Sequence, residues 1–397
     1  MACCLRNSAM AERARGKAGI RDSGFGSDAS ASRILNPESR PCEDFAHDLL
    51  AWFDSHGRKD LPWQHPRSPY RVWVSEIMLQ QTQVRTVIGY FERFVEALPT
   101  LASLAQAPLD RVLALWSGLG YYPRARHMHR AAQMCIERHG GDLPRDFEAL
   151  AALPGIGRST AGAILAQAFG MRHAILDGNV RRVLARLHGV RGWGGTAAVQ
   201  RTLWEFAEAH TPATRVADYT QAIMDLGATV CVRSRPLCPA CPARMDCVAF
   251  REGVTAELPS PKPSRARPTR DTTMLIVRDV DGRVLLEQRP PTGIWAGLWS
   301  LPETGDAASV RETLRERYAL RTESTHALRD FVHSFSHYHL HVTPLVVSGM
   351  REPGVAEDAT RGWFSREDLP TLGLPSPVRR LLNTVFEDET WQEPCTA

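Results

Sequence analysis

Four cysteines lie close together in the chain and have the spacing of a metal site. Cys231, Cys238, Cys241 and Cys247 fall within seventeen positions, separated by gaps of six, two and five residues. Thiolates are soft ligands, and four of them can enclose either a tetrahedral zinc ion or a cubane iron–sulfur cluster. The uneven gaps differ from the paired spacing of a zinc ribbon. Clustering of four among nine cysteines indicates a metal site in a reducing compartment rather than a disulfide scaffold.

A glycine turn and a later aspartate form a second candidate site. The segment LPGIGRSTAGAIL, residues 153–165, has Gly155 and Gly157 in a tight turn that leads directly into a helix. Glycine lets the backbone approach a ligand closely, and the helix N-terminus offers unpaired N–H groups to an anion. Asp177 follows twenty residues after Gly157, in LDGNVRRVLAR. An aspartate before Gly-Asn-Val could cap the next helix.

The order of these features resembles the helix-hairpin-helix DNA glycosylase superfamily over residues 43–250. The cysteine gaps match the superfamily's 4Fe-4S loop, so the resemblance implies that cofactor at residues 231–247. It also implies that Asp177 stabilises the cationic sugar left as the base departs. Members that also cut the strand carry a lysine in the first turn after the hairpin, where this chain has Ser159. A Schiff base requires an amine, and Ser159 offers only a hydroxyl without a basic neighbour, which favours a monofunctional glycosylase.

Glu76 is the candidate for a second carboxylate. Breaking an N-glycosidic bond requires a protonated leaving base and a stabilised oxocarbenium-like sugar, so two carboxylates in different environments are needed. Glu76 stands among apolar residues in VWVSEIMLQQTQV, where burial would raise its pKa and retain a proton at neutral pH. The stretch LPWQ…SEIMLQQTQV resembles the signature of the MutY adenine glycosylases. By that resemblance Glu76 protonates adenine at N7, Asp177 stabilises or captures the sugar, and Asn179 orients the reacting groups.

The same resemblance places a set of residues against DNA. Gln81 and Tyr121 match residues that enter the base stack from the minor groove, where something must fill the gap that a flipped base leaves. Ser159 departs from the tyrosine that some members carry at that position. The predicted DNA contacts are Gln81, Tyr121, Gly155, Gly157, Ser159 and Arg181.

The C-terminal part carries an incomplete Nudix box. GLWSLPE, residues 297–303, resembles the opening of that box. Paired glutamates and then a glycine should follow, but these positions hold Arg315, Glu316 and Tyr318. A magnesium site that loses a carboxylate and gains a guanidinium binds its metal poorly. We therefore expect a Nudix-like fold without pyrophosphatase activity.

The predicted lesion-recognition residues are Phe335, Ser336 and His337. In MutY proteins the Nudix-like domain recognises 8-oxoguanine opposite the adenine, commonly through such a triplet. The segment HSFSHYHLHVTPLVV, residues 333–347, is predicted to be a strand. On that interpretation its four histidines (His333, His337, His339 and His341) share one face, although strand spacing without nearby Cys or Asp disfavours a zinc site.

Helices must position the cysteines, the two carboxylates and the DNA contacts. Strands must position the lesion-recognition residues. Apolar residues recur at helical spacing from Ile77 through Val84, Ile88 and Phe91 to Val95. Further helices are predicted over residues 109–116, 125–138, 159–168, 180–187, 199–208 and 219–229. After residue 271 the sequence predicts a hairpin at Asp281-Gly282, a helix over 310–320 and a closing helix over 376–387. The predicted fold is an all-α helix-hairpin-helix glycosylase domain followed by an α+β Nudix-like domain.

The length of 397 residues suits two domains. Residues 251–270 form a basic, proline-rich linker, either a solvated tether or a segment lying along a phosphate backbone. The predicted divisions are a disordered extension over 1–40, the glycosylase domain over 41–250, the linker over 251–270, the lesion-recognition domain over 271–389, and a tail over 390–397.

Composition permits a nucleic-acid partner without demanding one, because the net charge is only +4 and the sequence pI is about 8.6. The predicted function is hydrolysis of the N-glycosidic bond of adenine in duplex DNA with A:8-oxoguanine or A:G mispairs. The protein is expected to be a monomer and to have no membrane partner. We expect a cytoplasmic, nucleoid-associated protein in a bacterium, or a nuclear or mitochondrial one in a eukaryote. The alternatives are a pyrimidine-lesion glycosylase/lyase, a catalytically silent Fe-S DNA-binding protein, and a nucleotide-pool hydrolase.

Overall fold

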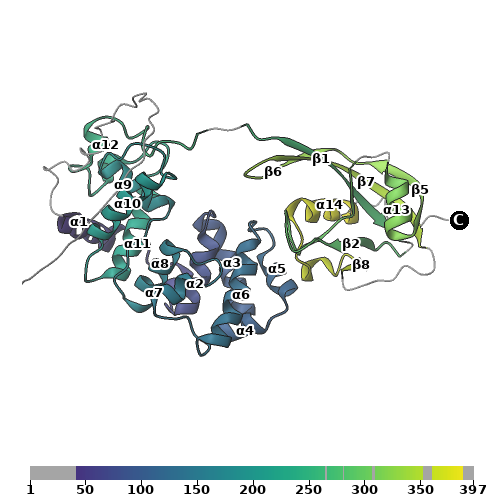
Figure 1. The fold of residues 1–397 in the computed structure, drawn as a ribbon, viewed down its shortest axis with the longest axis horizontal. Helices are drawn as coiled ribbons and strands as arrows, with labels where there is room; N and C mark the ends of the chain where they lie inside the picture. Colours follow the sequence, from purple (N-terminus) through teal and green to yellow (C-terminus); the bar gives the residue numbers. More distant parts are fainter. Residues whose placement is uncertain (1–41, 264–265, 280, 306–308, 352–359, 388–397) are drawn as a thin grey trace, which may run out of the picture. The chain divides into compact units, whose positions relative to one another are not determined.

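The computed structural model describes residues 42–263, 266–279, 281–305, 309–351 and 360–387. Residues 42–251 form helices, and residues 269–387 form a mixed sheet with two long helices (Figure 1). The predicted class, an all-α part followed by an α+β part, is confirmed. The predicted disordered extension and C-terminal tail lie outside the described residues.

The helices of the first part are amphipathic or wholly buried, with short breaks between them. They are α1 (Cys42–His56), α2 (Pro69–Leu79), α3 (Val84–Ala97), α4 (Leu101–Gln106), α5 (Leu109–Trp116), α6 (Pro123–Arg138), α7 (Phe147–Ala151), α8 (Arg158–Phe169), α9 (Gly178–Leu187), α10 (Ala197–His210), α11 (Val216–Asp225) and α12 (Val248–Arg251).

The predicted helices are all found, with small differences at their ends. The helix expected from residue 125 begins at Pro123, because a proline ring suits the first helical position. The apolar stripe from Ile77 to Val95 is divided between α2 and α3, because Gln81 has the left-handed φ of 60° and breaks the helix. The helix expected to end at residue 229 changes at Leu226 into a π-helical turn, Leu226–Val230.

Two apolar cores organise these helices, and α8 contributes to both. The first core contains Trp73, Phe91 and Trp116 from α2, α3 and α5, together with Ile164 of α8. The second is built mainly from α1, α9, α10 and α11, and Ala163 of α8 joins it. A helix that is apolar nearly all round is buried. Helix α8 therefore lies between the lobe that carries Glu76 and the lobe that carries Asp177.

The second part is one mixed sheet. Its strands are β1 (Thr269–Arg278), β2 (Val284–Gln288), β3 (Trp299–Ser300), β4 (Glu303–Thr304), β5 (Leu320–Ala327), β6 (Phe331–Ser334), β7 (His339–Arg351) and β8 (Arg361–Phe364). The strand order is β3-β2-β1-β7-β5, with β1 and β7 parallel. The predicted hairpin of β1 and β2 is confirmed by their antiparallel pairing.

Helices α13 (Val310–Tyr318) and α14 (Ser376–Glu387) cover opposite faces of this sheet (Figure 1). Side chains of a strand alternate between faces. Met274 and Ile276 of β1 belong to the core that includes α14, whereas Leu275 and Val277 belong to the core that includes α13. Burial on both faces explains the continuous apolar run of β1.

The single strand predicted over residues 333–347 is wrong. Strand β6 ends at Ser334, the chain reverses, and β7 begins at His339. The backbone N–H of Phe335 donates to the carbonyl of Tyr338 at 2.9 Å and closes the turn. His333 pairs with Leu340 while Ser334 pairs with His339, so His333 faces away from His339 on the sheet. The four histidines therefore do not share one face. Phe335, Ser336 and His337, hereafter the FSH triplet, lie at a hairpin turn.

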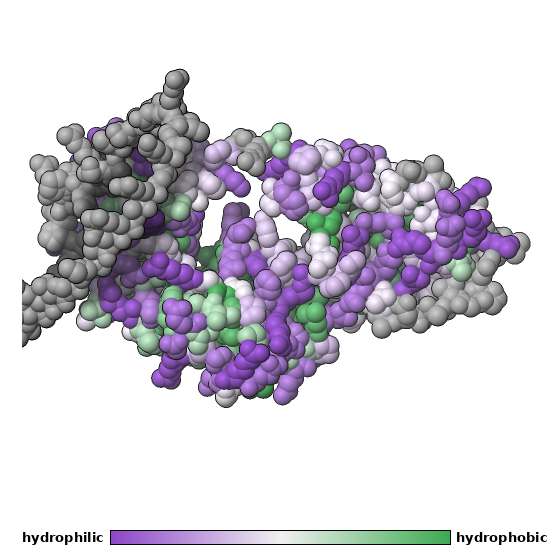
Figure 2. Space-filling model, in the orientation of Figure 1, coloured by the Kyte–Doolittle hydropathy of each residue, from purple (hydrophilic) through white to green (hydrophobic). Residues whose placement is uncertain are grey.

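The described surface is mostly hydrophilic on the face drawn in Figure 2. The larger apolar side chains lie in the cores, with a few exposed exceptions that include Tyr121 and Met245. Among the described residues, none of the helices has the length and hydropathy of a membrane span.

Candidate active site and cysteine cavity

Glu76 lies on α2 and is partly buried. Ser68 caps this helix by accepting a hydrogen bond from the Arg71 N–H, and Pro69 follows at the first helical position. The residues on either side of Glu76, Ser75 and Ile77, are each 1% exposed. This burial raises the pKa of Glu76 from its ordinary 4.5 to about 7, and the negative charge of Asp177 raises it further. The carboxyl can therefore hold a proton near neutral pH.

A residue that the sequence analysis did not identify contacts this carboxyl. The side-chain amide of Gln167, on α8, donates from Nε2 to Oε1 of Glu76 at 2.8 Å. Gln167 is buried, with 4% of its surface exposed. The available signal was a single amide in the otherwise apolar helix segment AGAILAQAF.

Asp177 caps α9, as its position before Gly-Asn-Val predicted. Its Oδ1 atom accepts hydrogen bonds from the N–H groups of Asn179 at 3.1 Å and Val180 at 2.8 Å. Both bonds go to Oδ1, so Oδ2 accepts none from the described residues. Burial raises the pKa of Asp177, although these N–H groups and the guanidinium of Arg182 favour its charged form. The capping bonds fix the carboxylate, and capping is compatible with a chemical role for the other oxygen.

The glycine turn is tight and leads into α8. Gly155 has a φ of 81°, and a Cβ there would come 2.9 Å from the Cβ of His127, so only glycine fits. Gly157 is the N-terminal cap residue of α8 and leaves the first N–H groups of that helix without a side-chain cap. Ser159 turns inward, where its Oγ accepts a hydrogen bond from the Leu176 N–H at 3.0 Å.

Gln81 and Tyr121 lie in two loops and share a strained backbone. Their φ values are 60° and 50°, a left-handed conformation that non-glycine residues rarely adopt. The Gln81 side chain is exposed, and Tyr121 is 51% exposed despite its large ring. Strain of this kind persists only where the surrounding structure imposes it, and it concentrates at functional sites.

Arg124, which the sequence analysis also did not identify, donates hydrogen bonds to both loops. Its guanidinium donates to the carbonyls of Met78 and Gln80 at 2.8 and 2.5 Å, and to the carbonyl of Gly120 at 3.2 Å. It also lies over the Tyr121 ring at 5.7 Å from the centroid. Burial lowers the pKa of Arg124 to about 10, so it remains charged at neutral pH.

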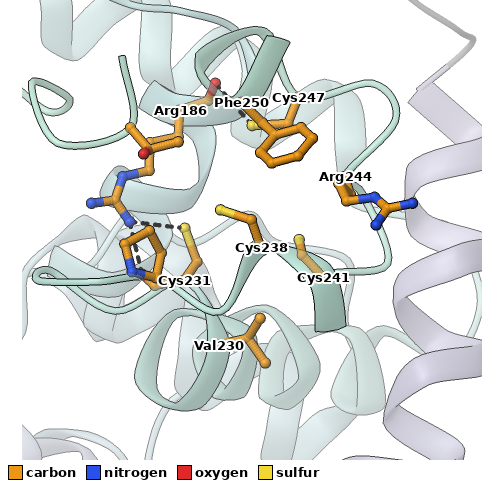
Figure 3. Close-up of a pocket in the computed structure, with 10 residues that line it drawn as sticks. Arg186, Val230, Cys231, Cys238, Cys241, Arg244, Cys247 and Phe250 are labelled. Carbon is orange, nitrogen blue, oxygen red and sulfur yellow. Dashed lines mark hydrogen bonds between the residues drawn. The ribbon is translucent and has the colours of Figure 1, made fainter. Parts of the chain in front are cut away.

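The four predicted metal ligands line one cavity. Cys231, Cys238, Cys241 and Cys247 surround it together with Arg186, Arg244 and Phe250 (Figure 3). Arg186 is 2% exposed and donates to Sγ of Cys231 at 3.3 Å. Within the described residues, no three His, Cys, Asp or Glu side chains are grouped closely enough to hold a metal ion. The four thiols nevertheless line one cavity, and this donor set suits an iron–sulfur cluster, which is larger than a single ion.

A single arginine connects this cavity with the aspartate segment. Arg182 donates to Oδ1 of Asn179 at 2.8 Å and to the carbonyl of Cys231 at 2.7 Å. The π-helical turn brings Gly227 against Asn179, where a Cβ would come 2.6 Å from the Asn179 Cβ. Arg181 is partly buried, and its Nε has no hydrogen-bond partner among the described residues.

The FSH triplet combines a packed ring with exposed polar groups. Phe335 is partly buried, with ring centroids 4.9 Å from Tyr338 and 5.4 Å from Trp295. Ser336 and His337 are exposed, and the Ser336 Oγ lies 3.4 Å from Nδ1 of His337. The packed ring fixes the turn, which leaves the two polar side chains free to meet a ligand.

The altered Nudix positions lie on and beside α13. Arg315 is exposed and forms an ion pair with Glu316 at 3.5 Å. Tyr318 is buried, and its hydroxyl donates to Oε2 of Glu287 at 2.7 Å. Both side chains thus make protein contacts where the box would supply metal ligands or a small residue.

Comparison with known proteins defines the class of the chain. The model described as HhH-GPD superfamily base excision DNA repair protein matches residues 74–209, and the NUDIX domain model matches residues 273–384. Among solved structures, a thermostable thymine-DNA glycosylase is 27% identical, with a TM-score of 0.47, and the match covers 53% of this chain and 97% of that one. The helical part is therefore similar to the base excision repair superfamily that its model describes.

Full-length relatives define the family. The adenine DNA glycosylase of Buchnera aphidicola subsp. Acyrthosiphon pisum is 35% identical over 342 residues, covering 85% of this chain and 96% of that protein. The adenine DNA glycosylase of Homo sapiens is also 35% identical, covering 89% of this chain and 75% of that protein. The chain belongs to the adenine DNA glycosylase family, a family of base excision repair enzymes.

Proposed function

We propose that this chain hydrolyses the N-glycosidic bond of adenine mispaired with 8-oxoguanine or guanine in duplex DNA, without cutting the strand. The observation that carries the proposal is the pair of Glu76 and Asp177. One carboxyl has a pKa near 7, and the other is fixed at a helix N-terminus by two backbone N–H groups. An acid and a charged stabiliser in different environments are what this bond cleavage requires.

Each carboxylate has one task in the reaction. Protonated Glu76 donates to N7 of adenine, so the electron pair of the bond between C1′ and N9 leaves with a neutral base. Asp177 faces the cationic sugar with its negative charge until water attacks C1′, and the proton that this water loses passes to the ionised Glu76, which restores the acid. Asn179, held by Arg182, orients the reacting groups.

The DNA contacts follow from the exposed loops. Gln81 and Tyr121 enter the stack where the adenine leaves it, and the strain at both residues supports this role. Gly155 and Gly157 present backbone N–H groups to a phosphate, and Arg181 adds a positive charge. The substrate would be chromosomal DNA, in a bacterial nucleoid or in a eukaryotic nucleus or mitochondrion, bound by one copy of the chain.

Cys231, Cys238, Cys241 and Cys247 would hold a 4Fe-4S cluster. When bound, the cluster would brace the loop and take no part in the hydrolysis. Arg186 would donate to one ligand sulfur, and Arg182 would hold the neighbouring carbonyl.

Phe335, Ser336 and His337 would read the base opposite the adenine. Exposed hydroxyl and imidazole groups beside a fixed ring suit hydrogen bonding to the edge of 8-oxoguanine. Arg315 is ion-paired and Tyr318 is buried, which supports a Nudix-like domain that binds the opposite base in DNA and does not hydrolyse nucleotides.

Single-turnover excision on three duplexes tests the proposal. The substrates carry adenine opposite 8-oxoguanine, adenine opposite guanine, and thymine glycol. The proposal predicts excision from the first two, faster from the first, and intact strands until alkali is added. Excision of thymine glycol with spontaneous strand cleavage, and no release of adenine, would contradict it.

A further inference from the structure

The bond between Gln167 and Glu76 joins α8 to α2 at the candidate active site. Gln167 lies on α8 between Ala166 and Ala168, and α8 packs against α2, which carries Glu76. An amide buried without a partner destabilises the fold, so a buried glutamine is retained at little cost only where it is hydrogen-bonded. Here the partner of its Nε2 is the carboxyl itself, at 2.8 Å.

We propose that Gln167 is a positioning residue for Glu76: its amide occupies Oε1 of the carboxyl, so that the transferable proton resides on Oε2. This proposal rests on the proposed role of Glu76 as the acid. Gln167 does not touch the substrate and acts only through the carboxyl.

The assignment of the proton follows from the chemistry of the bond. An amide N–H only donates, so the oxygen it contacts must accept and cannot direct its own O–H along the same line. The neutral acid therefore places its hydrogen on Oε2. No described residue bonds to Oε2, and that atom is not among the buried side-chain atoms without a partner, so it is open to solvent or ligand.

The same hydrogen bond also affects the pKa of Glu76. A donor near a carboxyl favours its ionised form, so Gln167 lowers the pKa of Glu76 and opposes the larger upward effect of burial. If the amide were turned to present its oxygen, it would accept the proton of Glu76 and favour the neutral form. The two orientations predict opposite shifts when the amide is removed.

The test is the pH dependence of single-turnover adenine excision by the full chain. The wild type and Glu76→Gln are measured first. A wild-type rate that falls above pH 7, and loss of excision in Glu76→Gln, test the proposed function without reference to Gln167. Gln167→Met then removes the amide and keeps the chain length, and Gln167→Glu replaces it with a second carboxyl.

We expect the alkaline limb of Gln167→Met to move up by about one pH unit, because a hydrogen bond to a charged group is lost. In Gln167→Glu two carboxyls share one proton, so the limb should move up further. Thermal unfolding and mispair binding are measured for each variant to separate folding from chemistry.

Gln221→Leu is the matched control. Gln221 is 3% exposed, and its Nε2 donates to the buried carboxylate of Asp225 at 2.8 Å rather than to Glu76. This variant loses an equivalent bond, so its stability should fall while its pH limb stays at the wild-type position.

Three results would overturn the proposal. A lower rate with an unmoved limb in Gln167→Met would show a purely structural role, and a limb moved to lower pH would show the opposite amide orientation. If Gln167→Met does not fold, Gln167→Glu decides alone, because an unmoved limb there would show that the two side chains are not coupled. Loss of adenine excision by the wild type would instead reject the proposed function.

Discussion

The hydroxyl of Ser159 accepts a hydrogen bond from the backbone N–H of Leu176 at 3.0 Å, one residue before Asp177. The side chain that follows the glycine turn is therefore used to fix the segment that carries the aspartate. A hydroxyl so engaged, and without a basic neighbour, is not available as a nucleophile.

Reduction with borohydride during reaction should trap no protein–DNA adduct. A trapped adduct requires a Schiff base between an amine and C1′ of the sugar, and the lysine position of the strand-cutting enzymes is occupied by Ser159. The measurement is gel electrophoresis of the mispaired duplex after reduction. A trapped band at the level of a known glycosylase/lyase would show that another amine acts.

Protein purified without oxygen should be yellow-brown and contain about four irons per chain. The cavity lined by four thiols, with Arg186 against one of them, is the basis of this expectation. Metal analysis with absorption spectroscopy measures it. Stoichiometric zinc without iron would contradict this expectation and would indicate a structural zinc site instead.

A chain that ends at Arg270 should still excise adenine but should lose most of its preference for 8-oxoguanine over guanine. The carboxylates, hairpin and cysteine loop all precede that residue. The lost discrimination should be on the order of 1–3 kcal/mol, the scale of one good base-edge contact. The ratio of single-turnover rates on the two mispairs, at matched salt, measures it.

A double substitution in the full-length chain provides the matched comparison with the shortened chain. Phe335→Ala combined with Ser336→Ala should reproduce much of that loss, because the first removes the ring that fixes the turn and the second removes an exposed hydroxyl. An unchanged preference in the shortened chain would place discrimination in the helical part.

The fold class and the helix positions could be predicted because period and breaks are local properties of the sequence. The hairpin turn at Phe335 was missed because residues 333–342 contain no glycine, proline, asparagine or aspartate, the residues that most strongly mark a turn. Gln167 and Arg124 were missed for another reason: their partners are distant in sequence, and only packing brings them together. The rise in the pKa of Glu76 was predictable from its apolar neighbours, whereas the hydrogen bond that opposes it was not.

Glu76→Gln should stabilise the protein at alkaline pH. The pKa of Glu76 is raised from 4.5 to about 7 in the folded protein, so the folded state prefers the proton, and stability falls as pH rises through that range. Removing the partly buried charge should add on the order of 2 kcal/mol to the free energy of unfolding at pH 8 and little at pH 4.5.

Thermal unfolding at the two pH values measures this effect, with Glu92→Gln on the exposed side of α3 as control. The control should show no pH-dependent gain. An equal gain for both variants, or a loss for Glu76→Gln at pH 8, would contradict the burial of the Glu76 charge.

In the proposed reaction Glu76 supplies the proton and Asp177 the opposing charge. Single-turnover excision from the A:8-oxoguanine duplex by Glu76→Gln and Asp177→Asn, with binding of the same duplex measured alongside, tests it most directly. We predict that each variant binds the mispair nearly as tightly as the wild type and that excision is abolished in both. Excision near the wild-type rate in Glu76→Gln would contradict the account.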